Sequence, residues 1–139
     1  MDNEHYIMSP TGSSVRRVDK WGSGRYGASR GVRLHAGADF IAMPGQGVMA
    51  PIAGHIEREA RPYPNEVFSG VLMRAAWVEI KMFYFEPYRD MIGTDVSQGE
   101  VIGIAQDLQT KYPGITPHIH LEIESIDPEI LLQAVRKPH

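Results

Sequence analysis

The sequence predicts an all-β protein, a compact antiparallel β-sheet or sandwich. From residue 48 onward, short apolar or alternating runs recur at the spacing of hairpins, with turn residues between them. Ten prolines and 14 glycines suit turns better than long helices. The apolar fraction of 42% in 139 residues is enough for one core. We therefore expect a single domain that spans residues 1–139.

The elements follow in chain order. Residues 8–31 are rich in glycine, serine and arginine, which predicts a long ordered loop. Strands are predicted at residues 48–50, 54–59, 71–76, 78–85, 101–105 and 119–123. A short C-terminal helix is predicted next, because Asp127 can cap it and Pro128 suits its first position. Its apolar stripe would be formed by Ile130, Leu131 and Ala134.

Composition excludes several classes of function. The net charge is −3 and the charges are mixed along the chain, so we expect no nucleic-acid partner. There is no cysteine, so any metal must be bound by imidazole or carboxylate groups. No apolar run is long enough for a membrane span or a signal peptide. We therefore expect that the chain is synthesised in a cytoplasm and does not insert into a membrane.

The first chemical motif is the segment 33–40, in which His35 precedes Asp39 by four positions. On a helix the two side chains would share a face, but the small residues between them disfavour a helix. On a straight strand they would lie about 13 Å apart, too far for one metal ion. A bend at Gly37 would bring them together. Taken alone, the motif also fits a surface histidine and a turn aspartate that never meet.

The second motif is His118-Ile119-His120. Strand alternation places His118, His120 and Glu122 on one face, with Ile119, Leu121 and Ile123 toward the core. Two imidazoles side by side could act as a metal ligand and a base. In a chain with six histidines, such a motif carries weight only together with the first one.

Taken together, the motifs resemble the lysostaphin/LytM-type zinc metallopeptidases. The resemblance rests on the His35-x-x-x-Asp39 and His118-x-His120 spacings and on residues 48–54 and 99–103 between them. Within that superfamily the chain is most similar to the leukocyte cell-derived chemotaxin branch. The stretches that carry this likeness are residues 22–30, 81–84, 112–115 and 118–120.

The resemblance implies a site and a fold. The family's zinc ligands fall on His35, Asp39 and His120, and its catalytic histidine falls on His118. Two imidazoles and a carboxylate suit Zn²⁺, and three protein ligands leave a position for water, as in catalytic sites. The implied fold is an antiparallel β structure with the metal in a groove. Active members cut peptide bonds in bacterial cell-wall crosslinks.

One position departs from the family pattern. Active members carry a further histidine two residues after a tyrosine, and here Glu86 follows Tyr84 at that distance. An ionised carboxylate cannot donate a hydrogen bond to an oxyanion. Glu86 could instead be a catalytic general base, or a solvated charge at a strand end before Pro87. The chemotaxin branch also lacks that histidine and resembles a binding protein more than an enzyme.

Two functions follow as expectations. The first is a zinc metalloendopeptidase that acts on peptide crosslinks of bacterial peptidoglycan, with His118 and Glu86 as catalytic candidates. The second is a catalytically silent zinc module of the chemotaxin type that binds a peptide, glycan or protein. We expect a monomer. Because the absence of cysteines and of a signal peptide does not suit a secreted vertebrate protein, we expect a bacterial or phage origin, with access to the cell wall after lysis or secretion.

Overall fold

A computed structural model of the chain describes residues 6–14, 29–30, 33–34 and 37–129. The described segments are almost entirely strands and turns, so the all-β prediction is confirmed. The elements are, in chain order, β1 (Ser29–Arg30), β2 (Arg33–Leu34), β3 (Ala38–Ile41), β4 (Gly47–Met49), β5 (Gly54–Glu59), β6 (Gly70–Arg74), β7 (Val78–Phe83), β8 (Phe85–Pro87), the 3-10 helix η1 (Arg89–Met91), β9 (Asp95–Val96), β10 (Val101–Ala105) and β11 (His118–Ile126).

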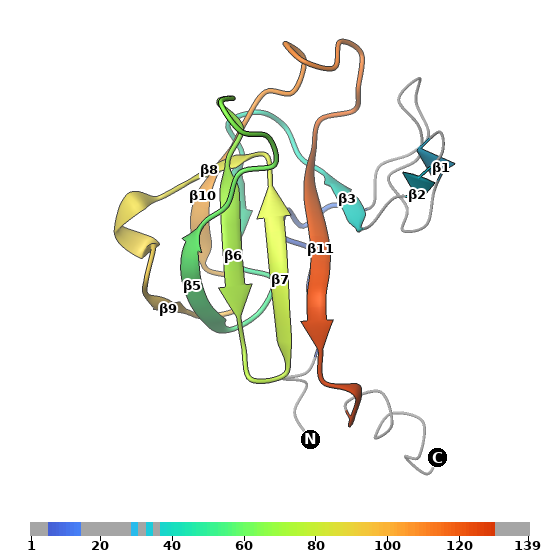
Figure 1. Ribbon diagram of the computed structural model, residues 1–139. Helices are drawn as coiled ribbons and strands as arrows, with labels where there is room; N and C mark the ends of the chain where they lie inside the picture. The colour runs from blue at the N-terminus through green and yellow to red at the C-terminus, as the bar shows by residue number, and fades with distance from the viewer. Residues whose placement is uncertain (1–5, 15–28, 31–32, 35–36, 130–139) are drawn as a thin grey trace.

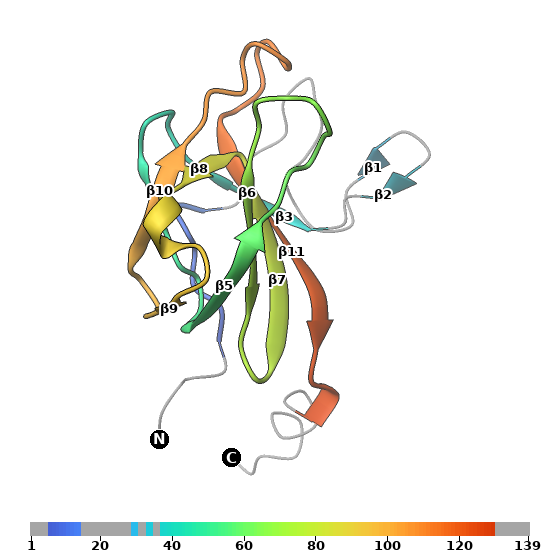
Figure 2. The ribbon, with the colours of Figure 1, turned by 60° about the vertical axis from the view of Figure 1, so that its left-hand side comes forward.

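The strands form two antiparallel sheets besides the small β1–β2 pair. The larger sheet has six strands in the order β3-β11-β7-β6-β5-β9, and the smaller one has the order β4-β10-β8 (Figure 1). The view in Figure 2 shows the smaller sheet beside the larger one. In both views the loops of residues 60–69 and 106–117 rise from the same end of the larger sheet.

One apolar core joins the two sheets. Along β7 the side chains alternate, with Val78, Ile80 and Met82 buried. They belong to the same cluster as Ile102 of β10 and Phe85 of β8. This alternation is what a sheet covered on one face requires. The core therefore fixes the position of the larger sheet relative to the smaller sheet.

The predicted strands agree closely in the middle of the chain. The strands predicted at 54–59 and 101–105 match β5 and β10. The strand predicted at 48–50 is shifted by one residue from β4, which spans Gly47–Met49. The run predicted at 78–85 is two strands, because Tyr84 has a φ of 83° and the chain passes there from one sheet to the other. Ile123 was expected in the core and is 46% exposed.

The two ends are described only in part. Asp127 Oδ1 accepts a hydrogen bond from the Glu129 backbone N–H at 2.9 Å, the contact expected of a helix cap. The rest of the predicted C-terminal helix, and residues 15–28 of the predicted N-terminal loop, lie outside the described residues. Within the described part of the chain, no helix has the length and apolarity needed to cross a membrane.

Candidate metal centre

The candidate site lies where β3 pairs with β11 at one edge of the larger sheet. In the antiparallel register Asp39 is directly opposite His120, and His118 is the first residue of β11. A Cβ at Gly37 would lie 2.2 Å from the Leu121 carbonyl oxygen. Only glycine therefore allows the chain to approach β11 this closely just before Asp39.

Asp39 is the hub of the site. Its carboxylate lies 2.8 Å from His120 Nδ1 through Oδ1 and 3.5 Å from His118 Nε2 through Oδ2. The side chains of Asp39 and His118 are 3% and 5% exposed, and that of His120 is 14% exposed. A carboxylate buried to this degree requires cationic or metal partners. The sequence predicted three metal ligands and one catalytic base. The structure brings three of these four residues together, Asp39, His118 and His120. His35, the fourth, lies outside the described residues.

His118 has one nitrogen committed to the backbone. Its Nδ1 lies 2.8 Å from the Thr116 carbonyl oxygen, which can only accept, so Nδ1 carries a proton. Nε2 then faces the Asp39 carboxylate. The ring of Tyr84 packs edge-on against the imidazole, with 5.5 Å between centroids. His118 is therefore fixed in orientation with Nε2 directed into the site.

His120 lies between two carboxylates. Its Nδ1 contacts Asp39, and its Nε2 lies 2.9 Å from Glu122 Oε1. Burial alone would lower the pKa of His120, but the hydrogen bonds to both carboxylates outweigh it and raise the pKa to about 9. The hydrogen bond from His120 in turn lowers the pKa of Glu122 to about 2. Sequence reasoning placed Glu122 on this face but missed its contact with His120, which periodicity alone does not reveal.

The donor set fits a zinc ion in part. Two donor atoms each about 2.0–2.1 Å from a tetrahedral Zn²⁺ lie about 3.3 Å apart. Asp39 Oδ1 and His120 Nδ1 are 2.8 Å apart, a hydrogen-bond distance that would lengthen by about 0.5 Å if an ion replaced the proton. The expected third ligand, His35, is not among the described residues, and within the described residues no group of three or more His, Cys, Asp or Glu side chains is arranged to hold a metal. The assignment of Asp39 and His120 as metal ligands therefore stays a prediction.

Glu86 makes its contact away from these residues. It lies on β8 with its side chain 49% exposed, and its Oε2 accepts a hydrogen bond from Arg89 Nη2 at 2.6 Å. Among the described residues, no hydrogen bond or ion pair joins it to Asp39, His118 or His120. This geometry favours the interpretation of Glu86 as a charge at a strand end over its interpretation as a catalytic base.

A cluster of tyrosines, formed by Tyr63, Tyr84 and Tyr112, connects the 60–69 and 106–117 loops beside His118. The Tyr63 hydroxyl bonds to the hydroxyls of Tyr84 (2.9 Å) and Tyr112. Lys111 of the 106–117 loop also pairs with Glu66 of the 60–69 loop at 2.9 Å. The rings of Tyr63 and Tyr84 pack on one another, and Tyr84 packs against His118, so the cluster joins both loops to the site.

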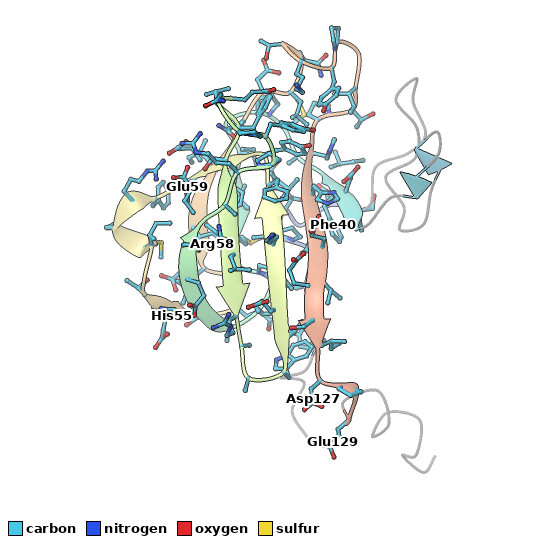
Figure 3. All side chains as sticks on the ribbon, in the orientation of Figure 1. Phe40, His55, Arg58, Glu59, Asp127 and Glu129 are labelled. Carbon is cyan, nitrogen blue, oxygen red and sulfur yellow. The ribbon has the colours of Figure 1, made fainter. Side chains whose placement is uncertain are left out.

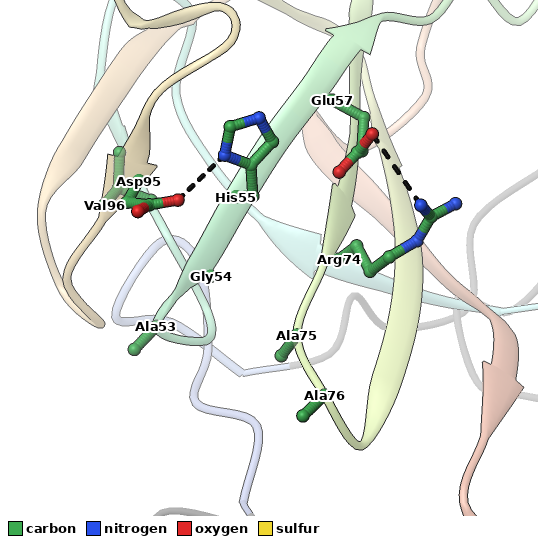
Figure 4. A pocket seen from close by; sticks show the side chains of 9 residues that line it. All are labelled: Ala53, Gly54, His55, Glu57, Arg74, Ala75, Ala76, Asp95 and Val96. Carbon is green, nitrogen blue, oxygen red and sulfur yellow. Dashed lines mark hydrogen bonds and ion pairs between the residues drawn. The ribbon is translucent and has the colours of Figure 1, made fainter.

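The cavity in Figure 4 lies at another place on the larger sheet. This shallow basin of about 550 Å³ is lined by small residues and by two pairs, His55 with Asp95 and Arg74 with Glu57. In Figure 3 His55 lies toward the opposite end of β5 from Glu59. The basin is lined by neither Asp39, His118 nor His120, so it does not form part of the metal site.

Relatives of this chain are animal proteins. It is 36% identical over 123 residues to leukocyte cell-derived chemotaxin-2 of Bos taurus, covering 86% of this chain and 80% of the relative. The protein of the same name from Mus musculus is 33% identical over 127 residues, covering 89% and 83%. Myeloid protein 1 of Gallus gallus is 32% identical over 119 residues, which are 82% of this chain and 36% of that protein. No family profile matches the chain.

Solved structures with the same fold are peptidases. The catalytic domain of the antimicrobial peptidase lysostaphin from Staphylococcus simulans superposes with a TM-score of 0.52 at 23% identity, over 81% of this chain and 89% of that one. A zinc-containing peptidase from Vibrio cholerae superposes with a TM-score of 0.57 at 18% identity, over 86% and 37%. At these identities the likeness establishes the fold.

The comparisons correct one expectation and establish the family. The expected bacterial or phage origin, and the route to the cell wall built on it, are wrong, because the relatives come from cattle, mouse and chicken and point to a eukaryotic origin. The missing cysteines that suggested a bacterium or phage report on redox environment rather than on lineage. The chain belongs to the leukocyte cell-derived chemotaxin-2 family and has the lysostaphin-type peptidase fold.

Proposed function

We propose that this chain is a zinc-binding module of the chemotaxin type, which uses a peptidase fold to bind a peptide, glycan or protein partner with little or no hydrolysis. His35, Asp39 and His120 would hold the ion. The observation that carries the proposal is the approach of His120 Nδ1 to the buried Asp39 carboxylate at 2.8 Å. The family of the relatives supports a binding role, and the zinc-containing peptidase among the fold neighbours supports the choice of metal.

The residues around the ion have distinct tasks. When bound, zinc lowers the pKa of a water ligand and polarises a carbonyl group. Asp39 contributes negative charge from a buried position, and His120 contributes Nδ1. His118 holds its Nε2 toward the same place because its Nδ1–H donates to Thr116. His118 is thus suited to accept a proton at Nε2 and is not needed as a ligand.

Weak or absent hydrolysis is proposed because of Glu86. The peptidase pattern places a hydrogen-bond donor at this position, and a carboxylate paired with Arg89 cannot donate to a developing oxyanion. A single oxyanion donor is worth about a hundredfold or more in rate. The site would therefore keep its metal and its base but lack one part of the transition-state binding.

A second candidate function is a zinc endopeptidase that acts as a monomer on peptide crosslinks of bacterial peptidoglycan. The buried His118 favours it, because Nδ1 is held by the Thr116 carbonyl and Nε2 faces the Asp39 carboxylate at 3.5 Å. A base in this orientation serves hydrolysis and has no evident use in a purely structural metal site.

Metal analysis tests the zinc site. We expect about one zinc per purified chain and thermal stabilisation on adding zinc. His120→Ala should abolish binding, because it removes a ligand, whereas His118→Ala should retain the metal. His55→Ala is the matched control, since His55 also pairs with an aspartate but outside the site. Equal zinc loss in the His118 and His120 variants would contradict the assigned roles.

Turnover of peptidoglycan and glycine-rich peptides, with and without a chelator, separates the two functions. For the binding module we expect little or no turnover by the native chain, and a gain of about a hundredfold for Glu86→His with unchanged zinc content. Glu86→Ala is the control that removes the carboxylate without adding a donor. Chelator-sensitive turnover by the native chain that is unaffected by Glu86→His would instead establish the second function.

A further inference from the structure

A row of charged side chains runs along β11 from the metal site toward solvent. It begins at His120 and continues through Glu122 and Glu124 to Lys81 on the neighbouring strand β7. Glu122 Oε1 lies 2.9 Å from His120 Nε2, and Lys81 Nζ lies 3.5 Å from Glu124 Oε1. Of these four residues, only His120 belongs to the proposed ligand set.

The contact with Glu122 determines which nitrogen of His120 gives up its proton to a metal ion. A carboxylate only accepts hydrogen bonds, so without a metal Nε2 donates to Glu122 and Nδ1 donates to Asp39 Oδ1 at 2.8 Å. A histidine ligand must be neutral, so one of these two protons has to leave when a metal binds. If Glu122 keeps the proton on Nε2, the metal replaces the proton on Nδ1.

The ring plane of His120 is fixed from a second direction. The ring of Phe83, at the end of β7, stacks on the imidazole with 6.1 Å between centroids and 5° between planes. Phe83 prevents tilting, but a stacked ring would equally accept the imidazole flipped by 180°. Among the described contacts of His120, the one with Glu122 gives the carboxylate at the Nε2 end that selects a single ring orientation.

We propose that Glu122 is a positioning residue that commits His120 to bind metal through Nδ1. The assignment rests on the proposed zinc site. Partners of this kind, which accept the other N–H of a metal-binding histidine, typically change metal affinity by about 10–100-fold. An alternative is a surface ion pair without effect on the metal, since the Glu122 side chain is 23% exposed.

The test measures zinc affinity by chelator competition in the full chain. Glu122→Ala should weaken zinc binding about 10–100-fold, and Glu122→Gln should recover most of it, because the amide oxygen can still accept from Nε2–H. Glu124→Ala is the matched control: it removes the same charge from the same strand, without a contact to His120, and should change the affinity by less than about threefold. Circular dichroism checks that each variant is folded.

Nitrogen-15 NMR of the zinc-loaded chain gives a second readout. The native chain and Glu122→Gln should show a protonated Nε2 and a metal-bound Nδ1 on His120, and Glu122→Ala should show a loss of this single pattern. Native affinity in Glu122→Ala, or an equal loss in Glu124→Ala, would overturn the positioning role while leaving the zinc site intact. A native chain that binds no zinc would overturn the proposed function itself.

Discussion

The larger sheet carries a histidine–aspartate pair at each of its two edges. At the β3 edge His120 lies opposite Asp39, and at the β9 edge His55 lies opposite Asp95. Both are cross-strand pairs of an antiparallel ladder, and both join Nδ1 to a carboxylate oxygen, at 2.8 Å and 2.7 Å. In local chemistry the two pairs are the same.

Their environments differ. The side chains of His120 and Asp39 are 14% and 3% exposed, whereas those of His55 and Asp95 are 41% and 89% exposed. Water screens the second pair and can replace either partner, while a buried carboxylate that loses its partner remains desolvated. The two pairs therefore differ in burial rather than in distance.

Removing the histidine from each pair should give the largest contrast. In the metal-free protein we expect His120→Ala to lower the free energy of unfolding by about 3–5 kcal/mol, because Asp39 loses a buried partner. His55→Ala should cost at most about 1 kcal/mol. Urea unfolding in the presence of a chelator measures both. Similar losses in the two variants would mean that burial does not separate the pairs.

Glycines beside the two pairs give a smaller effect. A Cβ at Gly37 would lie 2.2 Å from the Leu121 carbonyl oxygen, and one at Gly54 would lie 2.8 Å from the Arg74 carbonyl oxygen. We expect Gly37→Ala to cost about 2–3 kcal/mol and to weaken zinc binding, because β3 must move away from β11. Gly54→Ala should cost about 1 kcal/mol with zinc binding unchanged. Unfolding curves and zinc titrations check both, and unaltered zinc affinity in Gly37→Ala would count against the close approach.

Glu59 is an intermediate case, with a side chain that is 22% exposed. Hydrogen bonds from Arg89 and Ser69 lower its pKa from 4.5 to about 2. Because the folded pKa lies below the unfolded one, the stabilisation is present above about pH 4.5 and is lost as the pH falls toward about 2. Glu59→Gln should cost about 1–2 kcal/mol at neutral pH and flatten the stability profile in that acid window. Parallel pH profiles for the native chain and the variant would refute the assignment.

Much of the fold could be predicted because its signals are local. The strands at 54–59 and 101–105 were predicted to the residue, since turn residues bound each run. The run at 78–85 was predicted as one strand because its apolar pattern continues through Tyr84. The left-handed backbone of Tyr84, which moves the chain to the other sheet, is uncommon for a tyrosine and has no sequence signal of its own.

The candidate site was predictable in its members but not in its contacts. Spacing and family resemblance identified Asp39, His118 and His120, and the structure brings these three together. Strand alternation placed Glu122 on the same face, but only the rotamers reveal that it binds His120. The strand β3 was not predicted either, because its residues form a ladder only once β11 lies beside them.

The pairing of β3 with β11 has a consequence for how the protein folds. Asp39 and His120 are 81 positions apart in the chain, so the loop between them must close before they can meet. Loop closure of this kind costs entropy that is recovered only when the distant strands pair, and non-local pairing is slow. During synthesis β11 leaves the ribosome after the other strands that the structure describes. If the proposed zinc site is correct, metal capture would follow the pairing of β3 with β11 and would be a late event of folding.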